Sequence, residues 1–272
     1  MTDMAVITKI TTQQKNKDRF NIFMDSGKGE EYAFSVDSDV LVRFHLKKGL
    51  EIDEFAIQEI QYQDDIRKAY NLAVNYLARR MRSEKEIKDY LTQKEVEEPI
   101  IIEVLHKLDS LKYINDEEYA FSFVRTQMNT TDKGPDVITM ELKERGINEA
   151  LIKLAIAEYP KEDQVEKAIK VSEKLIKKST KDSERIVKQK AEQLLLRKGY
   201  PFDVIHIALN EAEIDKEQDE EMEAIRYQGE KAHRKYSKYS GFEFEQKMKQ
   251  ALYRKGFSIE LIEEYLSEVK KS

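Results

Sequence analysis

Side chains that could carry acid–base, nucleophilic or metal chemistry are few and scattered in this sequence. Cysteine is absent, which excludes disulfides, thiolate nucleophiles and thiolate metal sites. The glycine-rich run at residues 26–29 is expected in a hairpin, whereas a phosphate-binding loop precedes a helix. The four histidines share no metal-ligand spacing: His45, His106, His206 and His233. We therefore predict a protein that is not an enzyme and needs no cofactor or metal.

Basic side chains are the better candidates for function, as contacts to a partner. The formal net charge is −6, which disfavours strongly electrostatic binding to nucleic acid. Two local tracts, residues 174–190 and 231–239, could still bind phosphates, and the second interleaves cations with tyrosines. The alternative is that both tracts are solvated helix faces. The expected nucleic-acid contacts are Lys177, Lys178, Lys181, Lys231, Arg234, Lys235 and Lys238.

An internal repeat positions most of these residues. The block L-(L/Y)-R-K-G-(Y/F) occurs at residues 195–200 and 252–257, with a looser copy at 142–147. Isoleucine follows each glycine by six residues, and in a fourth, eroded copy Glu95 replaces the glycine. The equivalent positions are 95, 146, 199 and 256, which lie 51, 53 and 57 residues apart. Such a period indicates stacked supersecondary units, and we interpret these units first as a binding surface.

Two classes of element are expected along the chain. Strands at Ala5–Thr12, Arg19–Asp25 and residues 32–36 precede a short helix, and from residue 53 onward every segment is predicted to be helical. The first long helix is expected from about residue 64 to 82. We predict a mainly α fold of tandem three-helix repeats that form an elongated curved solenoid, with a small N-terminal β-meander and helix domain. The expected domains are residues 1–52, 53–113, 114–160, 161–213 and 214–272.

Helix-end signals explain several of the motifs structurally. Ser83 with Glu86 forms a capping box at a helix start. The block glycine falls one residue past a helix, where positive φ is needed, and the preceding Arg and Lys complement the helix dipole. A cap alone is the first interpretation of the block, and additional contact with a partner is the second. The acidic run at residues 215–223 has three explanations: a solvated helix start, a linker, or a mimic of DNA phosphates.

Recognition of specific base sequences is not expected. The third helices of the repeats carry almost no outward Arg, Asn or Gln, which are the residues that match base edges in the major groove. No apolar run approaches the roughly 20 residues of a membrane span. Residues 1–10 include Asp3 and lack the apolar stretch of a secretory signal. We expect a cytoplasmic chain that does not contact a membrane.

Three segments, taken in order, carry a family resemblance. Residues 80–87 match R-x-R-S-x-x-E-I, residues 113–120 match Y-I-N-D-x-x-Y-A, and residues 133–147 match K-G-P-x-x-I-x-x-E-L-x-x-x-G-I. Together they resemble the signatures of the RecX regulatory proteins. The third and fourth repeats and the N-terminal strands are similar to the longer Gram-positive members, so the resemblance spans nearly the whole chain.

The resemblance implies a non-enzymatic modulator of the RecA recombinase. Family members bind the RecA filament, in its helical groove, and inhibit filament growth, ATPase and strand exchange in DNA repair, homologous recombination and the SOS response. It implies a monomer whose partner is this filament, with single- and double-stranded DNA as further candidates. The alternative is a sequence-nonspecific nucleic-acid-binding protein that acts through the basic tracts of the last two repeats. The expected partner contacts are Arg80, Arg82, Arg125, Lys133, Arg145, Arg197, Lys198, Arg254 and Lys255.

Overall fold

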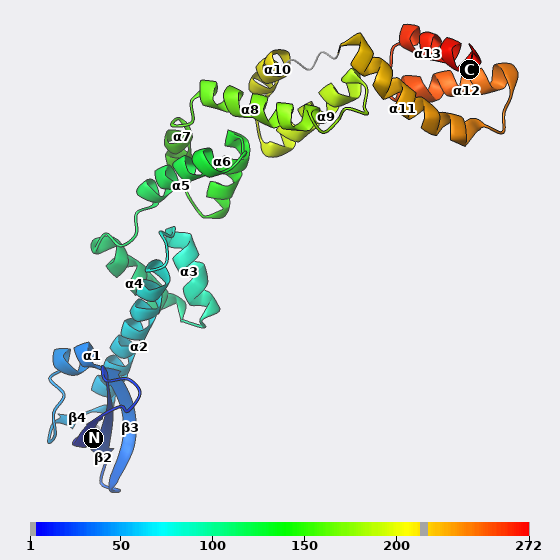
Figure 1. Cartoon of the computed structure of the whole chain (residues 1–272). Helices are drawn as coiled ribbons and strands as arrows, with labels where there is room; N and C mark the ends of the chain where they lie inside the picture. The colour runs from blue at the N-terminus through cyan, green and yellow to red at the C-terminus, as the bar shows by residue number, and fades with distance from the viewer. Residues whose placement is uncertain (1–3, 213–216, 272) are drawn as a thin grey trace. The chain divides into compact units, whose positions relative to one another are not determined.

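The computed structural model describes residues 4–212 and 217–271 (Figure 1). It divides the chain into two compact units, Met1–Tyr119 and Ala120–Ser272. The first contains the N-terminal sheet and the first repeat. The second contains most of the remaining three repeats, and helix α5 (Asp116–Thr130) crosses the division. The mainly α fold with a small N-terminal β domain is confirmed.

The N-terminal sheet is antiparallel, in the order β3-β2-β1-β4. Its strands are β1 (Ala5–Thr12), β2 (Arg19–Asp25), β3 (Glu30–Asp37) and β4 (Glu51–Ile52). Helix α1 (Ser38–Arg43) follows β3. The expectation of three strands was incomplete, because the two residues of β4 pair with Ala5 and Val6. The buried core of this domain includes Ile7, Ile22, Phe34 and Val36.

Helix α2 (Glu54–Leu77) belongs to both the sheet domain and the first repeat. It begins well before the expected residue 64, because the Asp53 side chain caps it by accepting a hydrogen bond from the Ala56 N–H at 2.8 Å. Ile60 packs into the core of the sheet, whereas Ala69 and Ala73 pack into the core of the repeat. The helix also ends before the expected residue 82.

Buried charges join the sheet to α2. Asp64 is only 1% exposed. Its carboxylate accepts hydrogen bonds from the Arg19 guanidinium at 2.8 and 3.3 Å and from the Asp37 N–H at 2.7 Å. Arg67, one turn further along α2, pairs with Asp37 at 3.3 Å. A buried carboxylate is stable only when hydrogen bonds and an opposite charge compensate for its lost hydration. The network therefore fixes the sheet on the helix.

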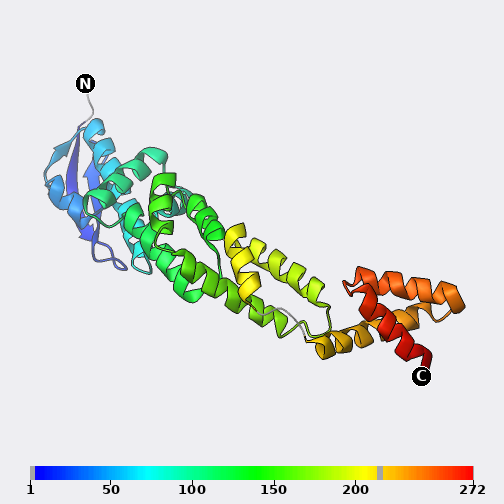
Figure 2. The same ribbon diagram turned by 90° about the horizontal axis from the view of Figure 1, so that it is seen from above.

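Each of the four repeats contains three helices, which Figures 1 and 2 show from two directions. Repeat 1 comprises α2, α3 (Glu84–Gln93) and α4 (Glu98–Ser110). Repeat 2 comprises α5, α6 (Pro135–Glu144) and α7 (Glu149–Ile156). Repeat 3 comprises α8 (Lys161–Ile176), α9 (Glu184–Lys198) and α10 (Phe202–Glu211). Repeat 4 comprises α11 (Gln218–Tyr236), α12 (Gly241–Arg254) and α13 (Ile259–Lys271).

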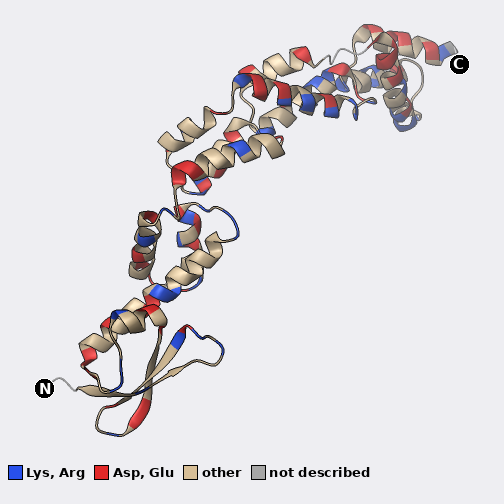
Figure 3. Ribbon diagram, turned by 60° about the vertical axis from the view of Figure 1, so that its left-hand side comes forward, with Lys and Arg blue, Asp and Glu red and all other residues tan. Residues whose placement is uncertain are grey.

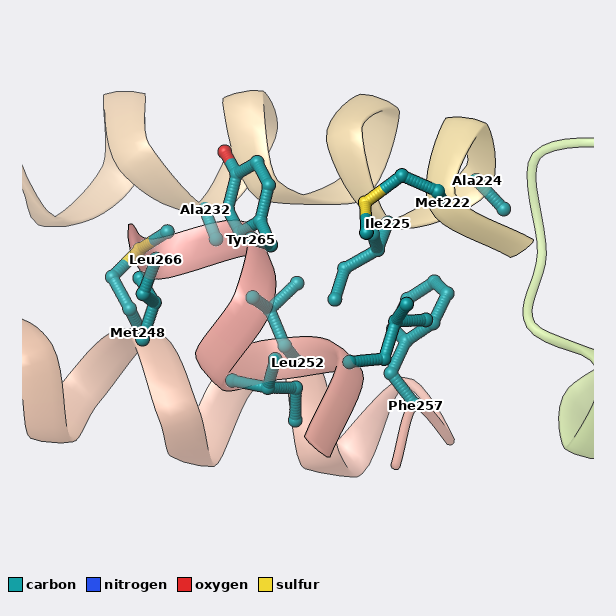
Figure 4. Packing of buried hydrophobic residues seen from close by; sticks show 11 residues of the cluster. Met222, Ala224, Ile225, Ala232, Met248, Leu252, Phe257, Tyr265 and Leu266 are labelled. Atoms are coloured by element: carbon teal, nitrogen blue, oxygen red, sulfur yellow. The ribbon is translucent and has the colours of Figure 1, made fainter. Parts of the chain in front are cut away.

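Repeat 4 shows how these small units form a core. Apolar side chains from all three helices meet in one cluster, in which Ile225 of α11, Leu252 of α12 and Tyr265 of α13 are at most 5% exposed (Figure 4). Of the acidic run before it, Asp219, Glu220 and Glu221 lie in the first turn of α11. Residues 215 and 216 of that run lie outside the described residues. The described part of the run is therefore a helix start, which is solvated at Asp219 and Glu220.

Consecutive repeats in the second unit meet at the ends of their middle helices. The Gly134 N–H donates to the Lys198 carbonyl at 2.7 Å, and the Asp136 N–H donates to the Gly199 carbonyl at 3.0 Å. A Cβ on Gly134 would lie 2.3 Å from the Gly199 oxygen, and one on Gly199 would lie 2.5 Å from the Val137 nitrogen. The block glycine thus permits close approach between repeats, in addition to its expected positive φ of 81°.

The joint between repeats 3 and 4 has the same form. The buried Ser183 hydroxyl at the start of α9 donates to the Lys255 carbonyl at 2.6 Å. A Cβ on Gly256, whose φ is 88°, would lie 2.5 Å from the Ser183 oxygen. The first N–H of α9, at Glu184, donates to the Glu221 carboxylate at 3.0 Å. The start of one middle helix is therefore capped by the following repeat.

Candidate functional site

Charged residues of both signs lie along the helices of the repeats (Figure 3). The arginines of the first family signature, residues 80–87, contact other residues of repeat 1. Arg80 Nη2 lies 2.6 Å from Glu86 Oε1, although half of the Arg80 side chain is exposed. Arg82 is only 12% exposed and lies over the Tyr76 ring at 4.0 Å. Tyr76 in turn stacks on Tyr90. Arg82 therefore takes part in the packing of repeat 1.

Glu86 links Arg80 to the start of α3. Its carboxylate accepts from the Ser83 N–H at 3.1 Å, while the Ser83 hydroxyl accepts from the Glu86 N–H at 3.2 Å, which completes the predicted capping box. Partial burial alone would raise the pKa of Glu86, but the hydrogen bonds from Ser83 and Arg80 outweigh it and hold the pKa below its usual value. Arg80 thus supports a helix cap while remaining half exposed.

The signature cations of repeat 2 are also held within their own unit. Arg125 forms a two-pronged pair with Glu158 at 2.6 and 2.7 Å, yet its side chain is 62% exposed. Lys133 pairs with Glu141. Arg145 donates to the Glu141 carbonyl at 2.6 Å and lies over the ring of Phe123 at 4.6 Å. Among the three, Arg125 is the most accessible to a partner.

The cations of the repeated block lie in different environments. Lys198 is 29% exposed, and its Nζ lies 3.7 Å from Asp132. Arg197 and Arg254 are exposed, and within the part of the chain that the structure describes neither forms an ion pair. Exposed Lys255 borders a cavity of about 420 Å³ that Lys231 and Lys235 also line. These three lysines come from two helices, α11 and the end of α12.

Tyrosine rings hold most of the cations of the second basic tract. Lys231 of this tract lies over Tyr227 at 4.3 Å, and Lys181 of the first tract lies over the same ring at 4.4 Å. The hydrogen bond from Lys231 and the positive charges of both lysines lower the pKa of Tyr227. Lys238 lies 5.2 Å from the ring of Tyr239. The other two predicted contacts on α11 are Lys235, beside Tyr236, and Arg234, which is 78% exposed and 3.8 Å from Glu230.

The first basic tract borders a cavity of about 420 Å³ beside α8. Lys177 was predicted there, and Lys178 is exposed directly after it. Lys167 and Lys170, which were not predicted as contacts, line the same cavity together with Lys174 and Lys177. Their spacing on α8 could have revealed them, because residues three and four apart share a helix face. Partial burial lowers the pKa of Lys167, whose ammonium donates to the Thr131 carbonyl at 3.0 Å.

Neither a membrane-spanning helix nor a metal-binding cluster is present in the described residues. No helix there is long and apolar enough to cross a membrane. The same residues contain no group of three or more His, Cys, Asp or Glu side chains placed to hold a metal ion.

Four family models match the chain in order. The Regulatory protein RecX N-terminal domain matches residues 5–53, and the first and second RecX three-helix domains match residues 69–108 and 115–156. The third RecX three-helix domain matches twice, at residues 162–209 and 219–266. The chain belongs to the RecX family. Repeats 3 and 4 of this RecX chain are thus two copies of one domain type.

Curated relatives and solved structures agree with this assignment. Regulatory protein RecX of Bacillus cytotoxicus is 50% identical over 97% of both chains, and that of Bacillus subtilis strain 168 is 49% identical over 97% of this chain and 99% of the relative. A crystal structure of regulatory protein RecX covers 76% of this chain and is covered in full, with 37% identity and a TM-score of 0.66. RecX from Lactobacillus salivarius covers 56% of this chain and is itself covered to 99%, with 41% identity and a TM-score of 0.53. The predicted family is confirmed, and "regulatory protein" is not the name of an enzyme class.

Proposed function

We propose that this protein binds the RecA recombinase filament and inhibits its growth, ATPase and strand exchange, and so regulates homologous recombination and the SOS response in the cytoplasm. The observation that carries the proposal is the ordered match of RecX domains along nearly the whole chain. The proposed binding site is the helical groove of the filament. A monomer of this protein would contact successive RecA protomers through successive repeats.

The proposed contacts are cations of the repeats, and the exposed ones among them can reach a partner most readily. An ion pair in solvent contributes only about 0–1 kcal/mol to stability, so Arg125 can exchange Glu158 for a carboxylate of the partner at small cost. The same holds for half-exposed Arg80. The remaining proposed contacts are Arg82, Lys133, Arg145, Arg197, Lys198, Arg254 and Lys255.

Binding to DNA alone has less support as the main activity. The chain carries a net charge of −6, and lysines such as Lys181 and Lys231 already lie over a tyrosine ring. Such rings still offer stacking surfaces for unpaired bases. We therefore propose single- and double-stranded DNA as secondary contacts, through the predicted lysines of repeats 3 and 4.

The test is RecA ATPase on single-stranded DNA, measured while the full chain is titrated in. We expect ATP hydrolysis to fall as the protein is added. If hydrolysis is unchanged at every ratio, the proposed function is wrong. A salt titration separates the two modes: affinity for naked DNA should fall steeply with salt, because bound cations release counterions. Affinity for the filament, which rests on mixed protein contacts, should fall less.

A further inference from the structure

Two positions flank the repeated glycine and differ in character between the repeats. They lie three residues before and three residues after it. In repeat 2 they are Lys143 and Glu149, whose side chains form an ion pair at 2.8 Å. In repeat 1 they are also polar, Thr92 and Glu98. In repeats 3 and 4 all four are large and apolar: Leu196, Phe202, Tyr253 and Ile259.

These four side chains are exposed. Leu196 and Phe202 are 39% and 73% exposed, and Tyr253 and Ile259 are 51% and 56% exposed. Isolated exposed apolar residues are ordinary on protein surfaces. Here, however, they occupy equivalent positions in two repeats. We refer to Leu196 with Phe202 and to Tyr253 with Ile259 as the two apolar pairs.

The two residues of each apolar pair lie on either side of one turn. The ion pair in repeat 2 shows that side chains at these two positions reach each other across the turn between the middle and third helices. The same turn, with its positive-φ glycine, is present in repeats 3 and 4. Tyr253 also lies 5.8 Å from the guanidinium of Arg185, at the joint between the repeats. The apolar pairs therefore lie beside the repeat joints.

A cation accompanies each apolar pair. Arg197 directly follows Leu196, and Arg254 directly follows Tyr253. Both are exposed, and neither forms an ion pair within the described residues, whereas repeat 2 has Glu144 at the equivalent position. Aromatic side chains and arginine are the residues that carry most binding energy at protein interfaces. The complementary surface is an apolar hollow bordered by a carboxylate.

The presence of an apolar pair in both repeats indicates what kind of partner would bind them. Repeats 3 and 4 match the same domain model, so the chain presents one type of apolar pair twice. A polymer of identical protomers also presents one site many times. We propose that the two apolar pairs dock on the same apolar, carboxylate-bordered site of two protomers within one recombinase filament. This inference rests on the proposed function and specifies which residues recognise the filament.

Bivalent docking predicts a particular energetic behaviour. When the first pair is bound, the second binds as an intramolecular event, which can raise overall affinity by about 10²–10⁴ without any new kind of contact. Loss of either pair should therefore have a similar effect. Loss of both should remove the contribution of repeats 3 and 4 to filament binding.

The residues of repeat 2 at the same two positions suggest the substitutions for the test. L196K/F202E and Y253K/I259E would install in repeats 3 and 4 the Lys–Glu pair that repeat 2 already contains. A second set, L196S/F202S and Y253S/I259S, avoids new charges beside Arg185. Phe55→Glu is the matched control, because Phe55 is 72% exposed but lies on α2, outside the repeated positions. Thermal unfolding of every variant is measured alongside binding.

The binding measurement uses the full chain and recombinase filaments assembled on single-stranded DNA. We expect each double variant to weaken filament binding by about tenfold or more. All four substitutions together should reduce filament binding to the level that repeats 1 and 2 provide. Filament binding by Phe55→Glu, and the affinity of every variant for naked DNA, should stay unchanged. If both double variants bind filaments as tightly as the unaltered chain does, the inference is wrong and the proposed function stands.

Other outcomes identify other occupants. Equal loss of affinity for naked DNA would mean that the pairs contact nucleic acid, which contradicts docking on protomers. A dimer of the unaltered chain that becomes a monomer in the double variants would assign the apolar pairs to self-association, which also contradicts it. If the unaltered chain does not bind filaments at all, both the proposed function and this inference fail.

Discussion

The turns that follow the middle helices of repeat 1 and repeat 3 have the same backbone conformation but different residues. Glu95 in repeat 1 has a φ of 61°, and Gly199 in repeat 3 has a φ of 81°. Glu95 is exposed and borders an open cavity of about 550 Å³. Gly199 lies against Val137 of the preceding repeat. Glycine is therefore required where a turn docks on another repeat, whereas the turn alone tolerates a side chain.

Order along the chain explains the difference. Repeat 1 follows the N-terminal sheet, so its turn does not meet the start of another middle helix. A left-handed conformation costs an ordinary residue about 1–2 kcal/mol, which a folded unit can absorb. A Cβ 2.5 Å from a backbone nitrogen cannot be absorbed without moving the backbone. Steric overlap, more than the φ angle, therefore explains why position 199 needs glycine and position 95 accepts glutamate.

Substitution of Gly199 should have the largest effect. Gly199→Ala adds backbone strain to an overlap with Val137, and we expect it to lower the free energy of unfolding by about 3–5 kcal/mol. Chemical denaturation of the full chain, followed by circular dichroism, measures this change. Gly27→Ala is the control, because Gly27 has a φ of 93° but nothing within 4 Å of its Cβ position. The control should cost about 1 kcal/mol. Equal effects of the two substitutions would contradict the docking explanation.

The reverse substitution in repeat 1 should have a smaller effect of opposite sign. Glu95→Gly removes the left-handed strain but gives the unfolded chain more freedom, so we expect a net stabilisation of about 0.5–1 kcal/mol. The same denaturation measurement reports it. Destabilisation by Glu95→Gly would show that the Glu95 side chain makes a contact that repeat 1 needs.

The smallest expected effect concerns how the two middle helices begin. Glu86 caps α3, whereas the equivalent residue in α9 is Ile186, which does not titrate. Because the folded pKa of Glu86 is lowered, its contribution to stability is fully present above about pH 4.3, the pKa of a free glutamate. It is lost as the pH falls through the lowered folded pKa. Thermal unfolding of Glu86→Gln and of the unaltered chain should differ at pH 6 and converge below about pH 4. A difference that stays constant down to pH 3 would contradict this assignment.

The sequence predicted those elements whose bounds depend on residues close together in the chain. The bounds of β1 and β2 and the capping box at Ser83 followed from alternation and spacing. Strand β4 did not, because it consists of two residues that pair only after the chain returns to β1. The early start of α2 was missed because Ile57 and Ile60 face the sheet rather than the repeat core.

The candidate site was predictable to a similar extent. Family signatures identified Arg125 and Arg145 as candidates, but the partner of Arg125, Glu158, lies 33 residues away and only the fold brings them together. The packing of Arg82 on Tyr76 could not be read from spacing either. The apolar pairs could have been found by aligning the repeats, since Leu196 and Phe202 replace a Lys and a Glu.

Helix α2 has a consequence for how force and motion pass through the first unit. Its 24 residues span about 36 Å, and one continuous rod holds both the sheet, through Ile60 and Asp64, and the helical repeat, through Ala69 and Ala73. No loop separates the two layers along this rod. A force that rotates the sheet is therefore transmitted directly to repeat 1. The sheet cannot reorient relative to repeat 1 unless α2 bends or locally unfolds.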